Sequence, residues 1–280
     1  MCIRDSNNGG VVLDHVTVTN SVMATDAGDF WQGGGGIYNG DGASLMLIDS
    51  SVIGNTAAWS GGGVYSFFNA STTVVRSTIA GNTSNDVGGG FRLLSNAEIV
   101  NSTISNNEST GWYGGALFGT DGVVNLTNTT VADNTSPSYA PADLFVGTFG
   151  PGSATLTLTN TLVSSAGENC FVAPFGSGVV TLTVDHNNVF TDGTCSPGAS
   201  DAIVGDPLIG PLADNGGPTL THALEAGSPA IDFADGGVCP ATDQRGVTRP
   251  QGAGCDTGSF ESGAPSSLST DLGTTGKGIR

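Results

Sequence analysis

The sequence predicts an all-β protein: a single-stranded parallel β-helix of about seven coils, followed by a C-terminal turn-rich capping module. Three observations predict this fold. Apolar anchor residues that precede Asn-rich turns recur every 25 to 34 residues, which is the period of a solenoid. Apolar positions ahead of each anchor alternate with polar ones, as in a β-strand. The string "GGGGIY" returns as "GGGVY", "GGGFR" and "GGALF".

Three columns of apolar residues define the expected coils. The anchor column is Val18, Val52, Ile79, Ile104, Val131, Val163 and Val189. Five positions before each anchor stand Leu13, Leu47, Val74, Ile99, Leu126, Leu158 and Val184. Two positions earlier still stand Val11, Leu45, Thr72, Ala97, Val124, Leu156 and Leu182. In a parallel β-helix, equivalent residues of successive coils stack ~4.8 Å apart, so each column is expected to form a ladder.

An asparagine follows four of the anchors by three residues, at Asn55, Asn82, Asn107 and Asn134. Stacked asparagine side chains hydrogen-bond along the axis of a cross-β stack. We therefore expect these four residues to form a structural ladder.

The glycine triplets are expected at a corner of each coil, where the chain turns and its backbone packs closely against neighbouring coils. The next strand would begin at Ile37, Val64, Phe91 and Ala116, with Leu144 in the same column of the fifth coil. A phosphate-binding loop is disfavoured because no triplet precedes a Lys-Ser/Thr pair or an apolar helical run.

Four segments follow from these patterns. Residues 1–6, "MCIRDS", resemble a translated adapter remnant, and we expect that they are not native and that the true N-terminus is missing. Residues 7–205 form the repeats, 206–261 the capping module, and 262–280 a flexible tail.

Four cysteines besides Cys2 form two local pairs. Cys170 and Cys195 are one coil length apart, and stacked positions lie within the Cα separation of a disulfide. Cys239 and Cys255 would close a short loop in the module. No pair has the C-x₂-C spacing of a zinc site. Two disulfides indicate an oxidising compartment.

The C-terminal segment contains, in order, the strings "DPLIGPLADNGGPTLTHAL", "GSPAID", "DQRGVTRPQG" and "CDTGSFE". This set of strings resembles the terminal module of bacterial surface proteins called choice-of-anchor Q domain proteins. The glycine motifs look, more loosely, like those of polymorphic outer-membrane proteins. The resemblance implies a right-handed β-helix in a secreted or cell-surface bacterial protein whose anchor varies.

An open β-helix end exposes unpaired strand edges, so we expect the module to cover that end. Arg245 and Arg249 are interpreted as partners of nearby carboxylates that fix the module, and His222 as a hydrogen-bonded structural histidine. The nearby carboxylates are Asp232, Asp243, Asp256 and Glu261.

The formal net charge of -18 disfavours nucleic acid and anionic membranes as partners. No apolar run is long enough for a transmembrane helix. We also expect the protein to be a monomer. No cofactor is expected. Ca²⁺ at exposed carboxylates such as Asp26 and Asp29 is a secondary hypothesis on charge grounds, beside the simpler interpretation as solvated loop residues.

We expect a non-catalytic extracellular scaffold that contacts glycans or a host or neighbouring cell surface. The tryptophans ahead of glycine triplets, Trp31, Trp59 and Trp112, could stack on sugar rings or simply cover the glycine backbone. The alternative is a polysaccharide hydrolase or lyase, which the same fold supports. Its candidate carboxylates are Asp41, Asp49, Asp121, Asp133 and Asp185, but they form no cluster in the sequence.

Overall fold

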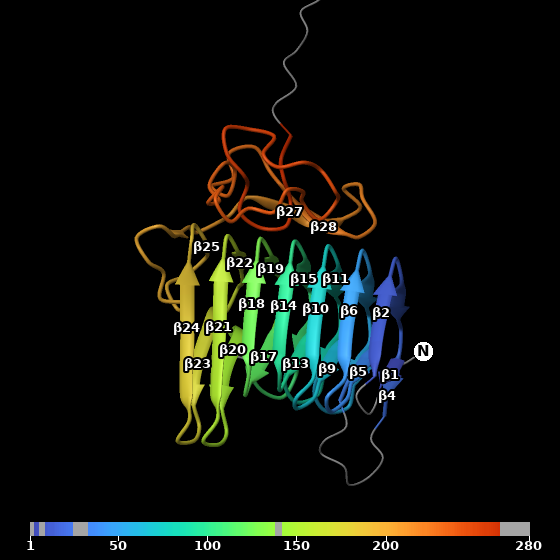
Figure 1. The fold of residues 1–280 in the computed structure, drawn as a ribbon. Coiled ribbons are helices and arrows are strands. Elements are labelled where there is room, and N and C mark those ends of the chain that lie inside the picture. Colours follow the sequence, from blue (N-terminus) through green and yellow to red (C-terminus); the bar gives the residue numbers. More distant parts are fainter. Residues whose placement is uncertain (1–2, 6–8, 25–32, 138–141, 264–280) are drawn as a thin grey trace, which may run out of the picture.

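The computed structural model describes residues 3–5, 9–24, 33–137 and 142–263. Within these residues there is no helix, and the strands form four parallel sheets and one antiparallel pair. Two of the parallel sheets, called A and B below, each contain seven stacked strands, so the described residues make about six turns of the β-helix. The parallel β-helix predicted from the repeats is confirmed, with the right-handed coiling that the resemblance implies (Figure 1).

Each coil contributes one strand to every sheet that it passes. Sheet A contains β1 (Ile3–Asp5), β5 (Ile37–Asn39), β9 (Val64–Ser66), β13 (Phe91–Leu93), β17 (Leu117–Thr120), β20 (Ala142–Thr148) and β23 (Glu168–Pro174). Sheet B contains β2 (Gly10–Asp14), β6 (Ser44–Ile48), β10 (Ser71–Val75), β14 (Asn96–Val100), β18 (Val123–Thr127), β21 (Ser153–Thr159) and β24 (Val179–Asp185). Sheet C contains β3 (Thr17–Thr19), β7 (Ser51–Ile53), β11 (Thr78–Ala80), β15 (Thr103–Ser105), β19 (Thr130–Ala132), β22 (Leu162–Ser164), β25 (Val189–Phe190) and β26 (Ala202–Ile203). Sheet D contains β4 (Val22–Met23), β8 (Thr56–Ala57), β12 (Thr83–Ser84) and β16 (Glu108–Ser109).

The stacking register matches the predicted columns almost throughout. Both columns of sheet B pair through all seven of its strands, and the anchors pair from Val18 to Val163. The seventh anchor is wrong, because Phe190 rather than Val189 lies opposite Val163. The preceding turn has two consecutive residues with positive φ, His186 and Asn187, and the longer turn moves the strand by one residue. The inward residues of these columns form one continuous apolar core.

The glycine triplets lie where the chain enters sheet A. A Cβ added to Gly35 would lie 2.3 Å from the carbonyl oxygen of Gly62, and one added to Gly62 would lie 2.4 Å from that of Gly89. Backbone therefore packs on backbone between coils at this corner, which only glycine permits. In the fourth coil, Ala116 takes the third position of the triplet and the strand begins at Leu117, so the predicted start at Ala116 is wrong by one residue. Leu144 pairs with Leu117 as predicted.

The four asparagines form a buried ladder between sheets C and D. The Nδ2 group of Asn55 donates to Oδ1 of Asn82, Asn82 donates in the same way to Asn107, and Asn107 to Asn134, each at 2.9 Å. In each pair, the backbone N–H of the donating asparagine also donates to the Oδ1 atom that accepts from its side chain. The side chain of Asp143 lies beside Asn134 at the end of the ladder, where burial raises the pKa of its carboxyl group well above its usual value.

The C-terminal module, residues 206–261, contains the antiparallel strands β27 (Ile209–Ala213) and β28 (Thr221–Leu224). It lies along the side of the β-helix, across the ends of the strands of sheets B and C (Figure 1). The expectation that it covers the open end is therefore wrong. Hydroxyl groups on the outer face of sheet C hold it there: Thr78 donates to the carbonyl oxygen of Leu220 at 2.6 Å, and Thr103 donates to Oε1 of Gln244 at 2.7 Å.

A column of left-handed turn residues between sheets B and C completes this contact. Asn101, Asn128 and Asn160 all have positive φ, and their Nδ2 groups donate to the carbonyl oxygens of Thr242, Asp256 and Asp235 at 2.7, 3.3 and 3.1 Å. Asparagine adopts this conformation readily, and its amide then points toward the module. The side of the coils, rather than their end, thus provides the matching polar surface.

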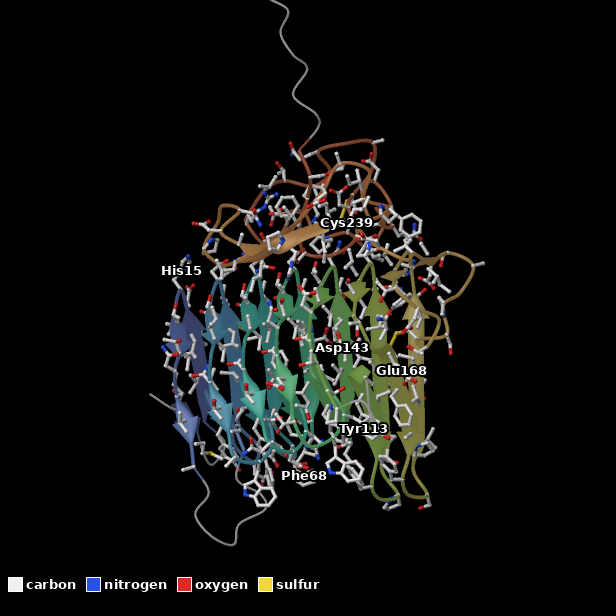
Figure 2. The ribbon with its side chains drawn as sticks, turned by 180° about the vertical axis from the view of Figure 1, so that it is seen from behind. His15, Phe68, Tyr113, Asp143, Glu168 and Cys239 are labelled. Atoms are coloured by element: carbon white, nitrogen blue, oxygen red, sulfur yellow. A yellow bond between two sulfur atoms is a disulfide. The ribbon has the colours of Figure 1, made fainter. Side chains whose placement is uncertain are left out.

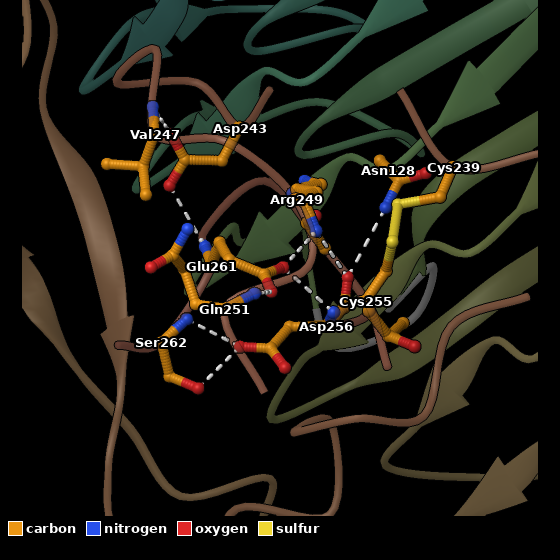
Figure 3. A network of polar contacts seen from close by, with 12 residues as sticks. Asn128, Cys239, Asp243, Val247, Arg249, Gln251, Cys255, Asp256, Glu261 and Ser262 are labelled. Atoms are coloured by element: carbon orange, nitrogen blue, oxygen red, sulfur yellow. Dashed lines mark hydrogen bonds and ion pairs between the residues drawn. A yellow bond between two sulfur atoms is a disulfide. The ribbon is translucent and has the colours of Figure 1, made fainter. Parts of the chain in front are cut away.

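Both predicted disulfides are confirmed. The Cα atoms of Cys170 and Cys195 are 4.9 Å apart, and those of Cys239 and Cys255 are 6.7 Å apart. Inside the module, Arg249 forms an ion pair with Glu261, both fully buried, and donates to the carbonyl oxygens of Asp256 and Gly258 (Figure 3). Arg245 pairs with Asp243 at 2.7 Å. These arginines hold the module together, as the sequence indicates.

A candidate binding groove on the outer face of sheet A

A single column of mostly aromatic side chains runs along the outer face of sheet A. Its members are paired in register from coil to coil: Tyr38, Tyr65, Arg92, Phe118, Phe145 and Phe171. Successive residues of a strand point to opposite faces. The preceding residue in each strand, such as Phe91 or Leu117, belongs to the inner core, so this column points outward.

Side chains of the column stack in two groups, Tyr38 with Tyr65 and Arg92 through Phe171. The rings of Tyr38 and Tyr65 are 5.5 Å apart, and those of Phe118 and Phe145 are 4.1 Å apart. Arg92 lies between these two aromatic pairs, with its guanidinium carbon 4.5 Å from the centre of the Phe118 ring. Flat groups in register at the spacing of a parallel sheet can stack face to face. Because the guanidinium group of Arg92 is planar, it can take the place of an aromatic ring in this column.

Further aromatic residues flank the column on both sides. Tyr113, from the turn that enters sheet A, stacks on Phe145 and Phe171 at 5.1 and 4.6 Å. Phe149 and Phe175, from the turns that leave sheet A, stack on each other at 5.4 Å. Phe118 and Phe145 are consequently buried although they lie on the outer face of the sheet.

These side chains enclose a groove of about 490 Å³. Its lining consists of Ser60, Tyr65, Asp86, Val87, Arg92, Trp112, Tyr113, Phe118, Phe149 and Phe175. Trp112, Phe149 and Phe175 stand at the rim and are 55%, 58% and 53% exposed. In Figure 2, Tyr113 lies at the side of the coils opposite Cys239 of the module. The groove is therefore not covered by the C-terminal module.

Arg92 forms the polar part of the floor. The residue is 9% exposed, and Nη1 donates to Oγ1 of Thr120 at 3.0 Å. Burial lowers the pKa of Arg92 to about 10, while Tyr65, Asp86 and Asp121 act in the opposite direction. Burial also raises the pKa of the neighbouring Tyr65 to about 12. At neutral pH the groove thus contains one desolvated cation beside a neutral phenol.

Asp86 is the carboxylate of the lining, and its Oδ2 accepts a hydrogen bond from Oγ of Ser60 at 3.0 Å. Its backbone pairs with the tryptophans of the adjacent coils: the N–H of Asp86 donates to the carbonyl oxygen of Trp59, and the N–H of Trp112 donates to that of Asp86. The expected tryptophan column is thus interrupted by Asp86 in the third coil. Trp112 lines the groove, Trp59 is half-buried, and Trp31 lies outside the described residues.

The carboxylates considered for hydrolysis do not come together. Asp41 and Asp121 occupy turns between sheets A and B in different coils, and Asp133 lies in a turn after sheet C. Asp49 makes a two-pronged ion pair with Arg76 at 2.8 and 2.7 Å, and Asp185 lies at the end of the last strand of sheet B. The Ca²⁺ candidates Asp26 and Asp29 lie outside the described residues.

His222 belongs to the contact between the module and the coils. Its Nδ1 lies 2.7 Å from the carbonyl oxygen of Gly210, which can only accept, so Nδ1 carries the proton and Nε2 accepts from Oγ of Ser105 at 2.8 Å. Burial is the main cause of the lowered pKa of His222. This arrangement agrees with the structural interpretation of the residue.

The sequence contains a signal for the aromatic column that the predicted columns do not include. An aromatic or arginine residue directly follows the first inward residue of each strand in "IY", "VY", "FR", "LF", "LF" and "CF".

The described residues include no apolar helix of the length that a membrane span requires. Comparisons with protein-family models, curated proteins and solved structures each found no match.

Proposed function

We propose that this protein is a non-catalytic, secreted or cell-surface β-helix scaffold that binds extracellular glycan in the groove on sheet A. The observation that carries this proposal is the set of exposed aromatic side chains at the rim of a polar-floored groove. Exposed aromatic residues gathered around a cavity mark binding sites rather than chance exposure.

The chemistry of the groove suits a carbohydrate. Aromatic rings offer flat apolar faces on which the C–H faces of pyranose rings can pack, and polar groups fix the sugar hydroxyls. Trp112, Phe149 and Phe175 supply the faces. Asp86 supplies a hydrogen-bond acceptor and Arg92 supplies donors.

The composition of the lining favours binding over cleavage. A glycoside hydrolase of the usual kind needs two carboxyl groups about 5 to 9.5 Å apart. Among the described residues that line the groove, Asp86 is the single carboxylate. A β-elimination needs a base that loses its proton near neutral pH, and Arg92, whose pKa is about 10, would remain protonated there.

The location forms the second part of the proposal. Two disulfides favour an oxidising, extracellular compartment. The module from Asp206 to Glu261 is proposed to be of the choice-of-anchor Q type, on the strength of its four sequence strings. Such a module would belong to a bacterial surface protein.

The test is a panel of neutral and acidic polysaccharides incubated with the purified chain. Retention by affinity electrophoresis and release of reducing ends are measured together. We expect retention without release, and loss of roughly two- to tenfold in affinity for Trp112→Ala and for Phe175→Ala. Met46→Ala, which removes a 38% exposed apolar side chain on sheet B, is the matched control.

Two results would contradict the proposal. Release of reducing ends or of unsaturated products would establish the hydrolase or lyase alternative. Retention that is unaffected by the Trp112 and Phe175 substitutions would place glycan binding elsewhere on the molecule.

A further inference from the structure

Arg92 is an unusual residue in the coil region. Between residues 7 and 205 the sequence has two cationic side chains, Arg76 and Arg92, in a chain of net charge -18. Arg76 is neutralised by its two-pronged contact with Asp49. Among the described residues, by contrast, no carboxylate oxygen lies within 4.0 Å of the Arg92 guanidinium.

The hydrogen-bonding capacity of Arg92 is directed by its stacking. The Phe118 ring covers a face of the guanidinium group. The five N–H donors of arginine lie in the plane of the group, at its edge. Nη1 donates to Thr120, and Arg92 lines the groove. An edge with further donors is therefore left for a ligand.

A desolvated cation favours an anionic partner. Removing an arginine from water without an opposite charge is unfavourable, and a carboxylate held in a bidentate contact restores the lost interactions. A neutral hydroxyl group would satisfy the donors less well. The burial that lowers the pKa of Arg92 is consistent with this unmet requirement.

The rest of the molecule disfavours a polyanion. Asp86 lies in the same groove, and the net charge of -18 repels a chain that carries a negative charge on every unit. Screening weakens this repulsion beyond about 8 Å at physiological salt. A single negative charge placed on Arg92 would gain the local contact with little of the long-range repulsion.

We propose that Arg92 is a specificity-determining residue that selects a glycan with isolated acidic sugar units on an otherwise neutral backbone. The carboxylate of the acidic unit contacts the edge of the Arg92 guanidinium group. Neighbouring neutral units pack against the aromatic rim formed by Trp112, Phe149 and Phe175. This inference rests on the proposed glycan binding and adds the class of ligand.

The experiment uses three oligosaccharides of equal length, the first two with the backbone of a polysaccharide from the panel that the protein retains. One has a single uronic acid unit, the second is its carboxyl-reduced form, and the third is a homo-oligouronate. Dissociation constants are measured by calorimetry at about 0.15 M and about 0.5 M salt. We expect the singly acidic ligand to bind at least ~10-fold more tightly than its carboxyl-reduced form at the lower salt. The homo-oligouronate should bind more weakly than the singly acidic ligand at that salt.

Arg92→Met replaces the cation by an apolar side chain in the stack, and Arg76→Met is the matched control for loss of one coil arginine. The preference for the singly acidic ligand should disappear in Arg92→Met and persist in Arg76→Met. The wild-type comparison of the acidic and carboxyl-reduced ligands needs no variant, so it tests the inference even if Arg92→Met fails to fold.

The outcomes separate the two proposals. Equal wild-type affinity for the acidic and carboxyl-reduced ligands would overturn the role of Arg92 and leave glycan binding intact. Tightest binding of the homo-oligouronate at the lower salt would overturn selection for isolated charges. If no polysaccharide of the panel is retained, glycan binding fails and the role of Arg92 fails with it.

Discussion

Asn82→Ala tests how strongly the asparagine ladder holds successive coils together. The Asn82 side chain is fully buried. Its Oδ1 accepts from the backbone N–H and from Nδ2 of Asn55, and its Nδ2 donates to Asn107 and to the carbonyl oxygen of Val52, all at 2.9 Å. The substitution removes all four hydrogen bonds at once.

The expected loss of stability depends on which hydrogen bonds the partners of Asn82 retain after the substitution. Nδ2 of Asn55 still donates to the carbonyl oxygen of Val18, and Oδ1 of Asn107 still accepts from the backbone N–H of residue 82. The backbone N–H of Asn55 loses the acceptor that the structure gives it. An orphaned buried donor costs about 1–3 kcal/mol and each other lost bond about 1 kcal/mol, so Asn82→Ala should lower the free energy of unfolding by about 4–6 kcal/mol.

Urea denaturation followed by circular dichroism measures the global effect, and hydrogen exchange of the Asn55 amide measures the local one. Asn125→Ala is the matched control, because that side chain makes an exposed contact with Glu98 and should change stability by less than about 0.5 kcal/mol. If Asn82→Ala were as stable as Asn125→Ala and the Asn55 amide remained protected, the ladder would not stabilise coil stacking.

Three further predictions concern the corner glycines, the coil disulfide and the module contact. Gly35→Ala should lower the free energy of unfolding by about 1–3 kcal/mol, seen as a lower urea midpoint, because its Cβ would lie 2.3 Å from the Gly62 carbonyl oxygen. Gly150→Ala is the control and should leave the midpoint unchanged, because a Cβ at that position meets nothing within 4 Å. Replacing both Cys170 and Cys195 by serine opens a crosslink of separation 25 and should destabilise the chain by about 3.5 kcal/mol; a change below about 1 kcal/mol would contradict this. His222 has a lowered folded-state pKa, so its contribution to stability is complete above its unfolded value of about 6.5 and is lost as pH falls through the folded-state value. The urea midpoint of the wild type, measured relative to that of His222→Asn, should therefore decrease from pH 7.5 to pH 5; Asp143 and Glu261, whose pKa values are raised, act in the opposite direction but are common to both proteins. A difference that does not change with pH would exclude His222 as the titrating group.

The coil register could be predicted because the evidence for it is local and repeated. The columns through Leu47 and Leu45 pair as predicted in every coil, since a one-residue slip would turn all their apolar side chains outward. The two errors occur where this evidence is weakest. Val189 follows a turn with an additional left-handed residue, and Ala116 replaces a glycine without changing the register of the backbone.

The candidate site could be predicted only in part. The position of Trp112 before a glycine triplet marks it as a candidate, and it lines the groove. No pattern in the sequence marks Phe149 and Phe175, because they lie in turns outside the columns and reach the groove only after sheet A has stacked. The sequence does not single out Arg92, since nothing local shows that the Phe118 ring of the adjacent coil covers its guanidinium group.

The sequence by itself determined the β-helix, its inner core, both disulfides and the requirement for glycine at the corners of the coils. All of these follow from periodicity and from contacts between equivalent residues one coil apart. Only the tertiary structure decided that the C-terminal module lies along the coils and that the outer face of sheet A carries a groove. Thr78 and Gln244, which are in contact, are separated by more than half of the chain, and no repeat encodes such a pairing. Contacts within a repeat are set by its period, whereas contacts between unlike surfaces depend on shape and hydrogen bonding that exist only once the coils have stacked.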